Sequence, residues 1–106
     1  MEKTRLEILR ETVATDPDNT FGHYGLAMEL QNTGQLAEAM QHFGFLLTQH
    51  PEYSAAYFQA SMLLVKMGRS KEAQKVLESG IEVTGRQGKT HAQSELQQAL
   101  SDLASE

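Results

Sequence analysis

Four histidines are the side chains in this sequence most suited to chemistry, as metal ligands or as general bases. They occupy positions 23, 42, 50 and 91. A helical zinc pair needs two histidines four residues apart with further ligands beside them, and no two histidines here have this spacing. We therefore expect no metal site. His23 is expected to fill an aromatic position in the packing. His42 and His50 are expected on or near the end of a helix, where the dipole favours a cation.

The segment from Gly85 to Thr90 ends in Gly-Lys-Thr, as a phosphate-binding loop does. The full loop also needs a glycine at position 83 and a preceding strand. Val83 occupies that position and the residues before it have a helical pattern, so we expect a flexible turn instead. Ser61, Ser79 and Thr48 have no base in recognisable relation that would activate a hydroxyl group. The chain has no cysteine, which excludes thiol catalysis. The sequence therefore predicts neither an enzyme nor a cofactor.

The distribution of charge limits the classes of partner. The net charge is −5, and the residues up to Tyr53 carry 3 basic and 8 acidic side chains, against 6 and 6 from Ser54 onward. Nucleic-acid binding needs a basic surface stripe, so we expect no such partner. No apolar run approaches the roughly 18 residues of a membrane span, and the N-terminus lacks the features of a signal peptide. We expect a cytoplasmic single domain of 106 residues.

Apolar residues recur at helical spacing in six segments separated by short turns. Pro17 and Pro51 end two of these segments, while Gly34 and Gly68 are expected to close two others in the left-handed conformation. The expected N-caps are Asn19 or Thr20, Ser54 and Ser70. Short turns require antiparallel neighbours, so the pattern predicts an all-α fold of helix hairpins. The expected helices span residues 2–15, 21–33, 36–49, 54–67, 71–83 and 90–104, with a loose turn at 85–88.

The stretch from Leu26 to Leu77 nearly repeats itself after 34 residues. Such a fixed period is typical of repeat architectures. Small residues at the repeated positions are expected where two helix axes approach closely, with large apolar residues on either side. The matched positions are Leu26-Ala27 with Ala60-Ser61, Leu30 with Leu64, Gly34 with Gly68, Glu38-Ala39 with Glu72-Ala73, and Phe43 with Leu77.

At these residues the chain resembles the tetratricopeptide repeat (TPR) family, whose pattern appears twice. The first copy is His23, Leu26-Ala27, Leu30, Gly34, Ala39, Phe43 and Pro51; the second is Tyr57, Ala60-Ser61, Leu64, Gly68, Ala73, Leu77 and Gly85. His23 in an aromatic position and Gly85 in the proline position depart from the pattern. The resemblance, which extends to small stand-alone bacterial TPR proteins, implies a right-handed α-solenoid of helix hairpins. It divides the chain into a half repeat at 1–19, repeats at 20–53 and 54–87, and a capping helix at 88–106.

The resemblance also implies a function. TPR domains are scaffolds and adaptors, and the first helices of their repeats line a concave groove that usually holds a peptide or a helix of another protein. An exposed apolar surface in such a groove marks an interaction site. The alternative is that these side chains pack against one another and against the last helix. The expected apolar anchors are Phe21, Tyr24, Met28, Phe58 and Met62, and the expected hydrogen-bonding residues are Gln31, Asn32, Gln59, Lys66 and Gln93.

Two further expectations concern the identity of the partner. Some TPR domains hold the C-terminal carboxylate of a chaperone peptide with Lys, Asn and Arg, but only Lys89 is basic at the corresponding positions here. An apolar groove does not repay the desolvation of a carboxylate, so we do not expect this ligand. The alternative function is a homodimer through the first helix, because Leu6, Ile8 and Val13 cannot all face one neighbour.

Overall fold

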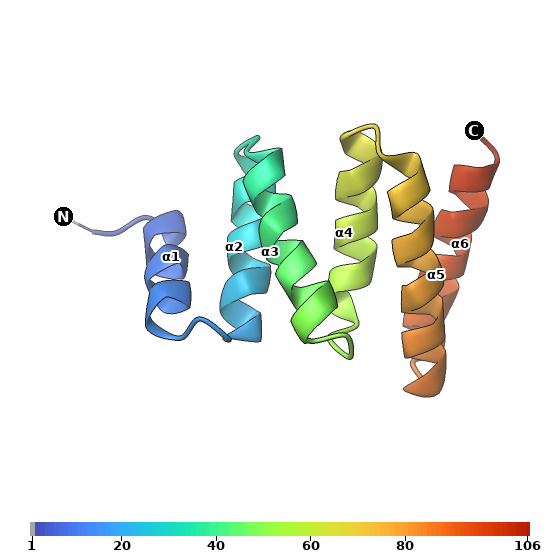
Figure 1. The fold of residues 1–106 in the computed structure, drawn as a ribbon, viewed down its shortest axis with the longest axis horizontal. Helices are drawn as coiled ribbons and strands as arrows, with labels where there is room; N and C mark the ends of the chain where they lie inside the picture. Colours follow the sequence, from blue (N-terminus) through green and yellow to red (C-terminus); the bar gives the residue numbers. More distant parts are fainter. Residues whose placement is uncertain (1) are drawn as a thin grey trace. The chain divides into compact units, whose positions relative to one another are not determined.

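The computed structural model describes residues 2–106 and divides the chain into two compact units, one ending at His50 and the other beginning at Pro51. All regular structure in these residues is helical (Figure 1), so the predicted all-α class is confirmed. No helix in this part of the chain has the length and apolar character to cross a membrane. Unit 1 contains α1 (Arg5–Thr15), α2 (Thr20–Asn32) and α3 (Leu36–Gln49); unit 2 contains α4 (Ala55–Lys66), α5 (Ser70–Arg86) and α6 (Thr90–Ala104).

The first helix begins later than its hydrophobic pattern predicts. The hydroxyl of Thr4 accepts a hydrogen bond from the amide of Glu7 at 3.1 Å, and the Glu7 carboxylate accepts one from the Thr4 amide at 3.2 Å. This reciprocal capping box satisfies two amides that the first turn leaves without partners. The expected start at residue 2 is therefore wrong, because Thr-x-x-Glu sets the boundary.

Caps at the other helix ends agree only in part with the sequence expectations. Asn19 caps α2, where its Oδ1 accepts from the amide of Gly22 at 2.6 Å. Gly34 and Gly68 follow α2 and α4 with φ of +82° and +77°, as predicted for left-handed C-terminal residues. Ser54 occupies the N-cap position of α4 as expected, but its side chain does not cap the helix, and the cap expected at Ser70 is wrong. Ser54 already has helical torsion angles and makes no capping hydrogen bond, and Ser70 is the first residue of α5.

The fifth helix extends to Arg86, past its expected end at Val83. Gly85 stands where the repeat pattern has proline, and glycine keeps the backbone amide that a helix needs. A Cβ atom at Gly85 would lie 2.6 Å from Nε2 of Gln93 in α6, so the missing side chain makes room for that contact. The helix ends at Arg86, and the chain turns at Gly88, whose φ is +70°. The loose turn expected at 85–88 is therefore wrong.

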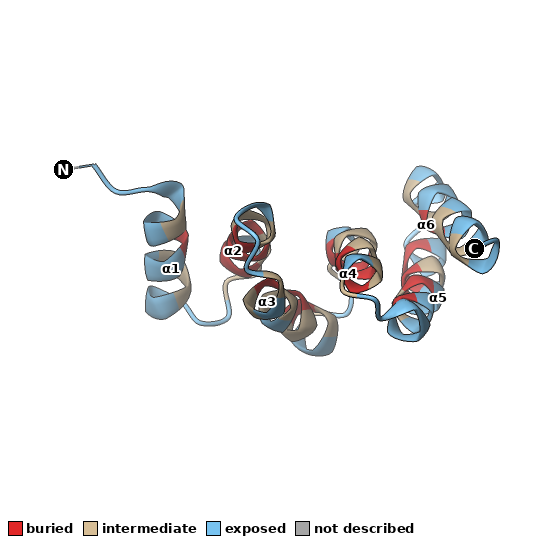
Figure 2. Cartoon of the chain, turned by 90° about the horizontal axis from the view of Figure 1, so that it is seen from above, coloured by how far each residue is buried: buried red, intermediate tan, exposed pale blue. Residues whose placement is uncertain are grey.

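Unit 1 is built around α2, which packs on both α1 and α3. A Cβ atom at Gly25 would lie 2.8 Å from Cδ2 of Leu9, so glycine allows α1 to approach α2 closely. Figure 2 shows the buried inner face of α2 in red and the exposed side of α1 in pale blue. The core consists of the residues that the 34-residue pattern selected, together with one more from α1 and one from α3: Leu9, Leu26, Ala27, Leu30, Ala39, Phe43 and Leu46.

Unit 2 is built in the same way around α5, which packs on α4 and α6. A Cβ atom at Gly80 would lie 2.7 Å from Cβ of Tyr57 and 3.1 Å from Cδ1 of Leu96. Tyr57 is held in place by its hydroxyl, which donates to the carbonyl of Pro51 at 2.6 Å. The small residues Ala60, Ser61 and Ala73 are fully buried here, as the repeat predicts. The repeat boundaries expected at residues 20, 54 and 88 stay a prediction.

Candidate functional site

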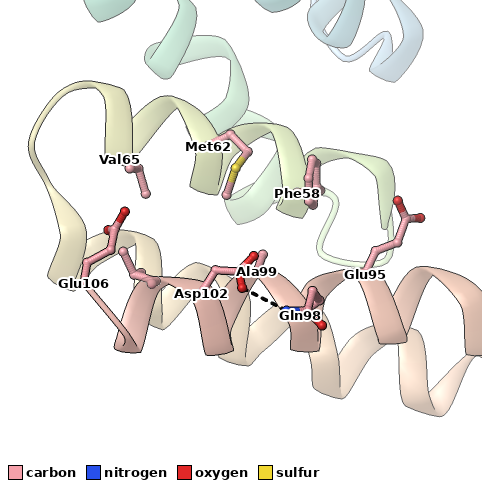
Figure 3. Close-up of a pocket in the computed structure, with 9 residues that line it drawn as sticks. Phe58, Met62, Val65, Glu95, Gln98, Ala99, Asp102 and Glu106 are labelled. Carbon is pink, nitrogen blue, oxygen red and sulfur yellow. Dashed lines mark hydrogen bonds between the residues drawn. The ribbon is translucent and has the colours of Figure 1, made fainter.

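Helices α4 and α6 of unit 2 border an open surface that the packing around α5 leaves unfilled (Figure 3). Two adjoining hollows of about 390 Å³ each share Phe58 and Glu95. We call the surface lined by both hollows the α4–α6 groove. Its lining residues are Ser54, Ala55, Phe58, Gln59, Met62 and Val65 from α4 and the preceding residue, and Ala92, Glu95, Leu96, Gln98, Ala99, Asp102, Leu103 and Glu106 from α6 and its C-terminal end.

The wall formed by α4 is apolar. Phe58, Met62 and Val65 are four and three residues apart and therefore share one face of the helix. Figure 3 shows all three side chains pointing from α4 toward α6. Each is half-buried, while Tyr57 and Leu64 on the neighbouring face are buried. The α4 wall therefore offers apolar surface that the folded chain leaves partly in solvent.

The wall formed by α6 combines an apolar floor with an acidic edge. Ala99 and Leu103 are half-buried, whereas Glu95, Asp102 and Glu106 are exposed. Glu95 and Glu106 lie toward the two ends of the hollow in Figure 3. This edge was not predicted, because residues 88–106 were expected to form a capping helix. The signal was present in the helical spacing of the three acids beside the two apolar residues.

In unit 1, the predicted anchors on α2 differ in their exposure. Phe21 is 71% exposed. Tyr24 and Met28 are half-buried, and the Tyr24 ring packs in a T-shaped arrangement with the fully buried Phe43, with 6.1 Å between ring centroids. Tyr24 is thus anchored in the core of unit 1, while Phe21 extends into solvent. The α2 face is therefore a partly open apolar surface within its own unit.

Four of the five predicted hydrogen-bonding residues differ in their exposure and in their distance from the groove. Gln59 is half-buried and lines the α4–α6 groove. Asn32 and Lys66 are exposed, each as the last residue of its helix. Gln31 is half-buried, and its Oε1 is buried with no hydrogen-bond partner among residues 2–106. Only Gln59 is thus placed directly in the groove.

The side chain of Gln93 packs against α5. Its Nε2 donates to the carbonyl of Ile81 at 3.2 Å, and the same atom occupies the space beside Gly85. Both contacts belong to the packing of α6 on α5, and Gln93 lines neither of the two hollows. Gln93 therefore joins the α5–α6 hairpin, and its predicted role in binding stays a prediction.

Two histidines in unit 1 form a pair that no local sequence pattern indicates. Nδ1 of His23 lies 3.0 Å from Nδ1 of His42, and Nε2 of His23 donates to the carbonyl of Pro17 at 2.7 Å. His23 also stacks on Phe45 with 4.1 Å between ring centroids, which confirms its predicted place in the aromatic packing. The short Nδ1–Nδ1 contact has room for one hydrogen. Both rings therefore cannot be charged together in this geometry.

His42 and His50 were both expected on or near the end of a helix, but only His50 lies there. His42 lies within α3, and burial together with the charge of His23 lowers its pKa. The prediction that a helix end favours its cation is therefore wrong. His50 follows α3, and its Nε2 lies 2.7 Å from Oδ1 of Asp18. In residues 2–106 no three histidine, aspartate or glutamate side chains are grouped so that they could hold a metal ion.

Lowering the pH from 7 to 5 is expected to reduce the free energy of unfolding. Because the pKa of His42 is lowered from 6.5 in the folded chain, the unfolded chain binds more protons in this range. The contribution of His42 to the free energy of unfolding is complete above its pKa in the unfolded chain, about 6.5. It is lost as the pH falls toward its lower pKa in the folded chain. Urea titrations at several pH values measure the slope. His42→Gln should flatten the slope of unfolding free energy against pH, and the exposed control His91→Gln should not. A flat profile for the wild type would contradict the assignment of the slope to His42.

The repeated hairpins define a helical-repeat protein. A family model described as tetratricopeptide repeat matches residues 30–89, more than half of the chain. The chain belongs to the tetratricopeptide repeat family. A solved tetratricopeptide repeat domain protein from Salinibacter ruber is 30% identical, with 83% of this chain and 89% of that chain covered and a TM-score of 0.79.

Two solved complexes share the fold at lower identity. PcrH in complex with the chaperone binding region of PopD is 15% identical, with coverage of 94% of this chain and 76% of that chain and a TM-score of 0.87. The TPR2B domain of yeast Sti1 in its pHsp70 complex is 14% identical, with coverage of 94% and 80% and a TM-score of 0.86. At these identities the likeness shows the fold alone, and it confirms the predicted fold class. Comparison with curated proteins finds no match.

Proposed function

We propose that this chain is a non-catalytic scaffold or adaptor that binds a peptide or helix of another protein, with the α4–α6 groove as its main contact surface. The observation that carries the proposal is the half-buried apolar face of Phe58, Met62 and Val65, which borders an open hollow. Apolar and aromatic side chains in such hollows supply most of the binding energy of protein interfaces. We retain the cytoplasmic location expected from the sequence as part of this proposal.

The size of the groove supports binding over internal packing. If Phe58 and Met62 served only the core, neighbouring side chains would fill the space between α4 and α6. Each of the two hollows instead retains about 390 Å³, within the range of about 300–1,000 Å³ typical of ligand pockets. In unit 1, the exposed ring of Phe21, with Tyr24 and Met28, supplies a second apolar surface.

The proposed ligand is not the C-terminal carboxylate of a chaperone. The single basic side chain at the expected positions, Lys89, donates its Nζ to Oγ of Ser54 at 2.9 Å. The nearby edge of α6 carries Glu95 and Asp102, which would repel a carboxylate. A yeast domain with this fold is solved in a pHsp70 complex, but the charges in this groove favour a different ligand.

Phe58→Ala and Met62→Ala are each expected to weaken partner binding by about 1–3 kcal/mol, because each removes an apolar anchor from the groove. The partner is first captured with the tagged wild-type chain and identified by mass spectrometry. Its binding segment is then titrated into both variants by calorimetry. Met67→Ala is the matched control, since Met67 follows α4 and lines neither hollow. Circular dichroism checks that the variants remain helical. If both groove variants unfold, these residues belong to the core and the proposal is wrong.

The second candidate function is self-assembly through α1. Of the three residues suspected from the sequence, Ile8 is 50% exposed, Leu6 is half-buried, and Val13 lies against Gly22 of α2. Ile8 is therefore the residue that a second copy would cover. Sedimentation equilibrium of the wild type and of Ile8→Asp decides this: a dimer abolished by the substitution favours assembly, and a monomer in both removes this candidate.

A further inference from the structure

We propose that the α4–α6 groove selects a positively charged amphipathic helix, one whose apolar stripe is flanked by Lys or Arg. This inference rests on the proposed function and adds the charge and the conformation of the partner segment. It follows from the one-sided distribution of charge along α6, from the position of two acids at the end of that helix, and from the length of the groove.

The acidic edge is not neutralised by basic residues of the chain. Glu95, Asp102 and Glu106 line the groove, and none of the lining residues is Lys or Arg. Asp102 accepts a hydrogen bond from the neutral amide of Gln98 at 2.8 Å. Glu95 has the exposed side chain of His91 at 3.4 Å. Three carboxylates beside an apolar floor therefore attract a cationic segment and repel an anionic one.

Neither of the nearby basic residues, Lys89 and Lys66, lines the groove. Lys89 lies at the other end of the groove, where its Nζ donates to Ser54. Lys66 is exposed in the last turn of α4 and lines neither hollow. The part of the groove beside Met62 and Val65 therefore carries negative charge from the side chains that line it.

The helix dipole adds to this negative field. Asp102 lies near the C-terminal end of α6, Glu106 follows that end, and the last turn has no basic residue. Acidic groups are unfavourable at this end, where the unpaired carbonyls carry partial negative charge. A basic side chain from a partner would relieve both repulsions at once. The arrangement thus disfavours the free chain slightly and favours the complex with a cationic segment.

The dimensions of the groove favour a helical occupant. Its lining within α6 runs from Ala92 to Leu103, which corresponds to about 17 Å or three helical turns. The apolar floor lies between the two helices, and the acids lie along one of them. A helix with apolar residues at i, i+3/i+4 and i+7 fills such a floor. The flexible side chain of Met62 adapts to the shape of the occupant.

Two synthetic helical peptides test the inference. They share one Leu and Met stripe, and the remaining positions carry Lys in one peptide and Glu in the other. Fluorescence anisotropy measures their affinities for the wild-type chain at low and high salt. We expect the Lys peptide to bind at least about tenfold more tightly at low salt, with the difference shrinking at high salt as the charges are screened.

Charge-neutral variants locate the source of this preference. Glu95→Gln/Asp102→Asn/Glu106→Gln removes the acidic edge and should lose most of the preference for the Lys peptide. The matched control, Glu52→Gln/Glu78→Gln/Glu82→Gln, removes three acids of unit 2 that do not line the groove and should retain it. The edge variant should melt no lower than the wild type, since it removes charges that the end of α6 disfavours. A preference retained by the edge variant would overturn the inference.

The remaining outcomes separate this inference from the proposed function. If both peptides bind equally and Met62→Ala weakens both, the groove binds helices without selecting their charge, and only the inference fails. If neither peptide binds, or if Met62→Ala changes nothing, the groove is not the binding surface and both proposals fail. A second copy of the chain is the other possible occupant, and sedimentation of the chain alone tests it. A dimer that Met62→Ala disrupts would place a second copy in the groove and overturn the inference.

Discussion

Phe43→Ala is expected to reduce the free energy of unfolding by about 3–5 kcal/mol, whereas Phe21→Ala should change it by less than about 0.5 kcal/mol. The two substitutions remove the same atoms from different surroundings. Phe43 is fully buried in unit 1, where it packs in a T-shaped arrangement with the Tyr24 ring. Phe21 is 71% exposed on α2. The truncation at Phe43 therefore leaves a cavity, and the truncation at Phe21 does not.

Urea denaturation followed by circular dichroism measures both changes on one scale. Small domains have a total stability of about 5–15 kcal/mol, so the loss at Phe43 would be a large share of the total. The slope of the unfolding free energy against urea should stay unchanged, because both variants expose a similar surface on unfolding. Similar small losses for the two variants would mean that Phe43 does not hold the α2–α3 hairpin together.

Gly80→Ala is expected to destabilise the chain by about 1–3 kcal/mol, although alanine is the better helix former. The new methyl group would lie 2.7 Å from Cβ of Tyr57, an atom attached directly to the backbone of α4. Relief of this clash requires α4 and α5 to move apart. Leu96 lies on the other side, so that α6 would also lose contact.

Gly44→Ala is the matched control for this prediction. Gly44 lies inside α3, and a Cβ atom there would meet nothing within 4 Å. The substitution should therefore raise the unfolding free energy by about 0.5–1 kcal/mol through helix propensity alone. Thermal denaturation of both variants shows whether each substitution raises or lowers the unfolding free energy. A stabilising effect at Gly80 would show that close approach of α4 and α5 is not what this glycine provides.

The sequence predicts the packing of the hairpins well because that packing repeats. Ala27 and Ala39 in unit 1, and their counterparts Ser61 and Ala73 in unit 2, are all fully buried. A position that is small in both copies of a 34-residue pattern indicates close helix approach in either copy. Periodicity therefore suffices for the core, and it requires no knowledge of contacts between distant residues.

Helix boundaries were predicted less well, because single hydrogen bonds determine them. The capping box at Thr4 moved the start of α1. The contact between Gly85 and Gln93 allowed α5 to continue where the repeat pattern has proline. Ser54 has the right residue type for a cap, yet its backbone is already helical and its hydroxyl accepts from Lys89. Residue preference alone cannot distinguish these local arrangements.

The polar features of the candidate site depend on contacts that no local pattern encodes. His23 and His42 meet across the α2–α3 hairpin although 19 residues separate them. Gln93 fits an amphipathic groove position by its spacing, but a carbonyl of α5 accepts its hydrogen bond. The three acids of the edge are evident in the sequence, but only the structure shows that they lie opposite the apolar wall of α4. Apolar periodicity thus predicts the core, while site chemistry depends on which helices face each other.

Binding in the α4–α6 groove is tested most directly by nuclear magnetic resonance of the isotope-labelled chain during titration with the Lys peptide. We predict that the largest shift changes occur at the methyl groups of Met62, Val65 and Leu103, which line the groove. The methyl groups of Ile8, on the exposed side of α1, should stay unchanged. Shift changes centred on α1, or the absence of changes at saturating peptide, would contradict the assignment of this groove as the binding surface.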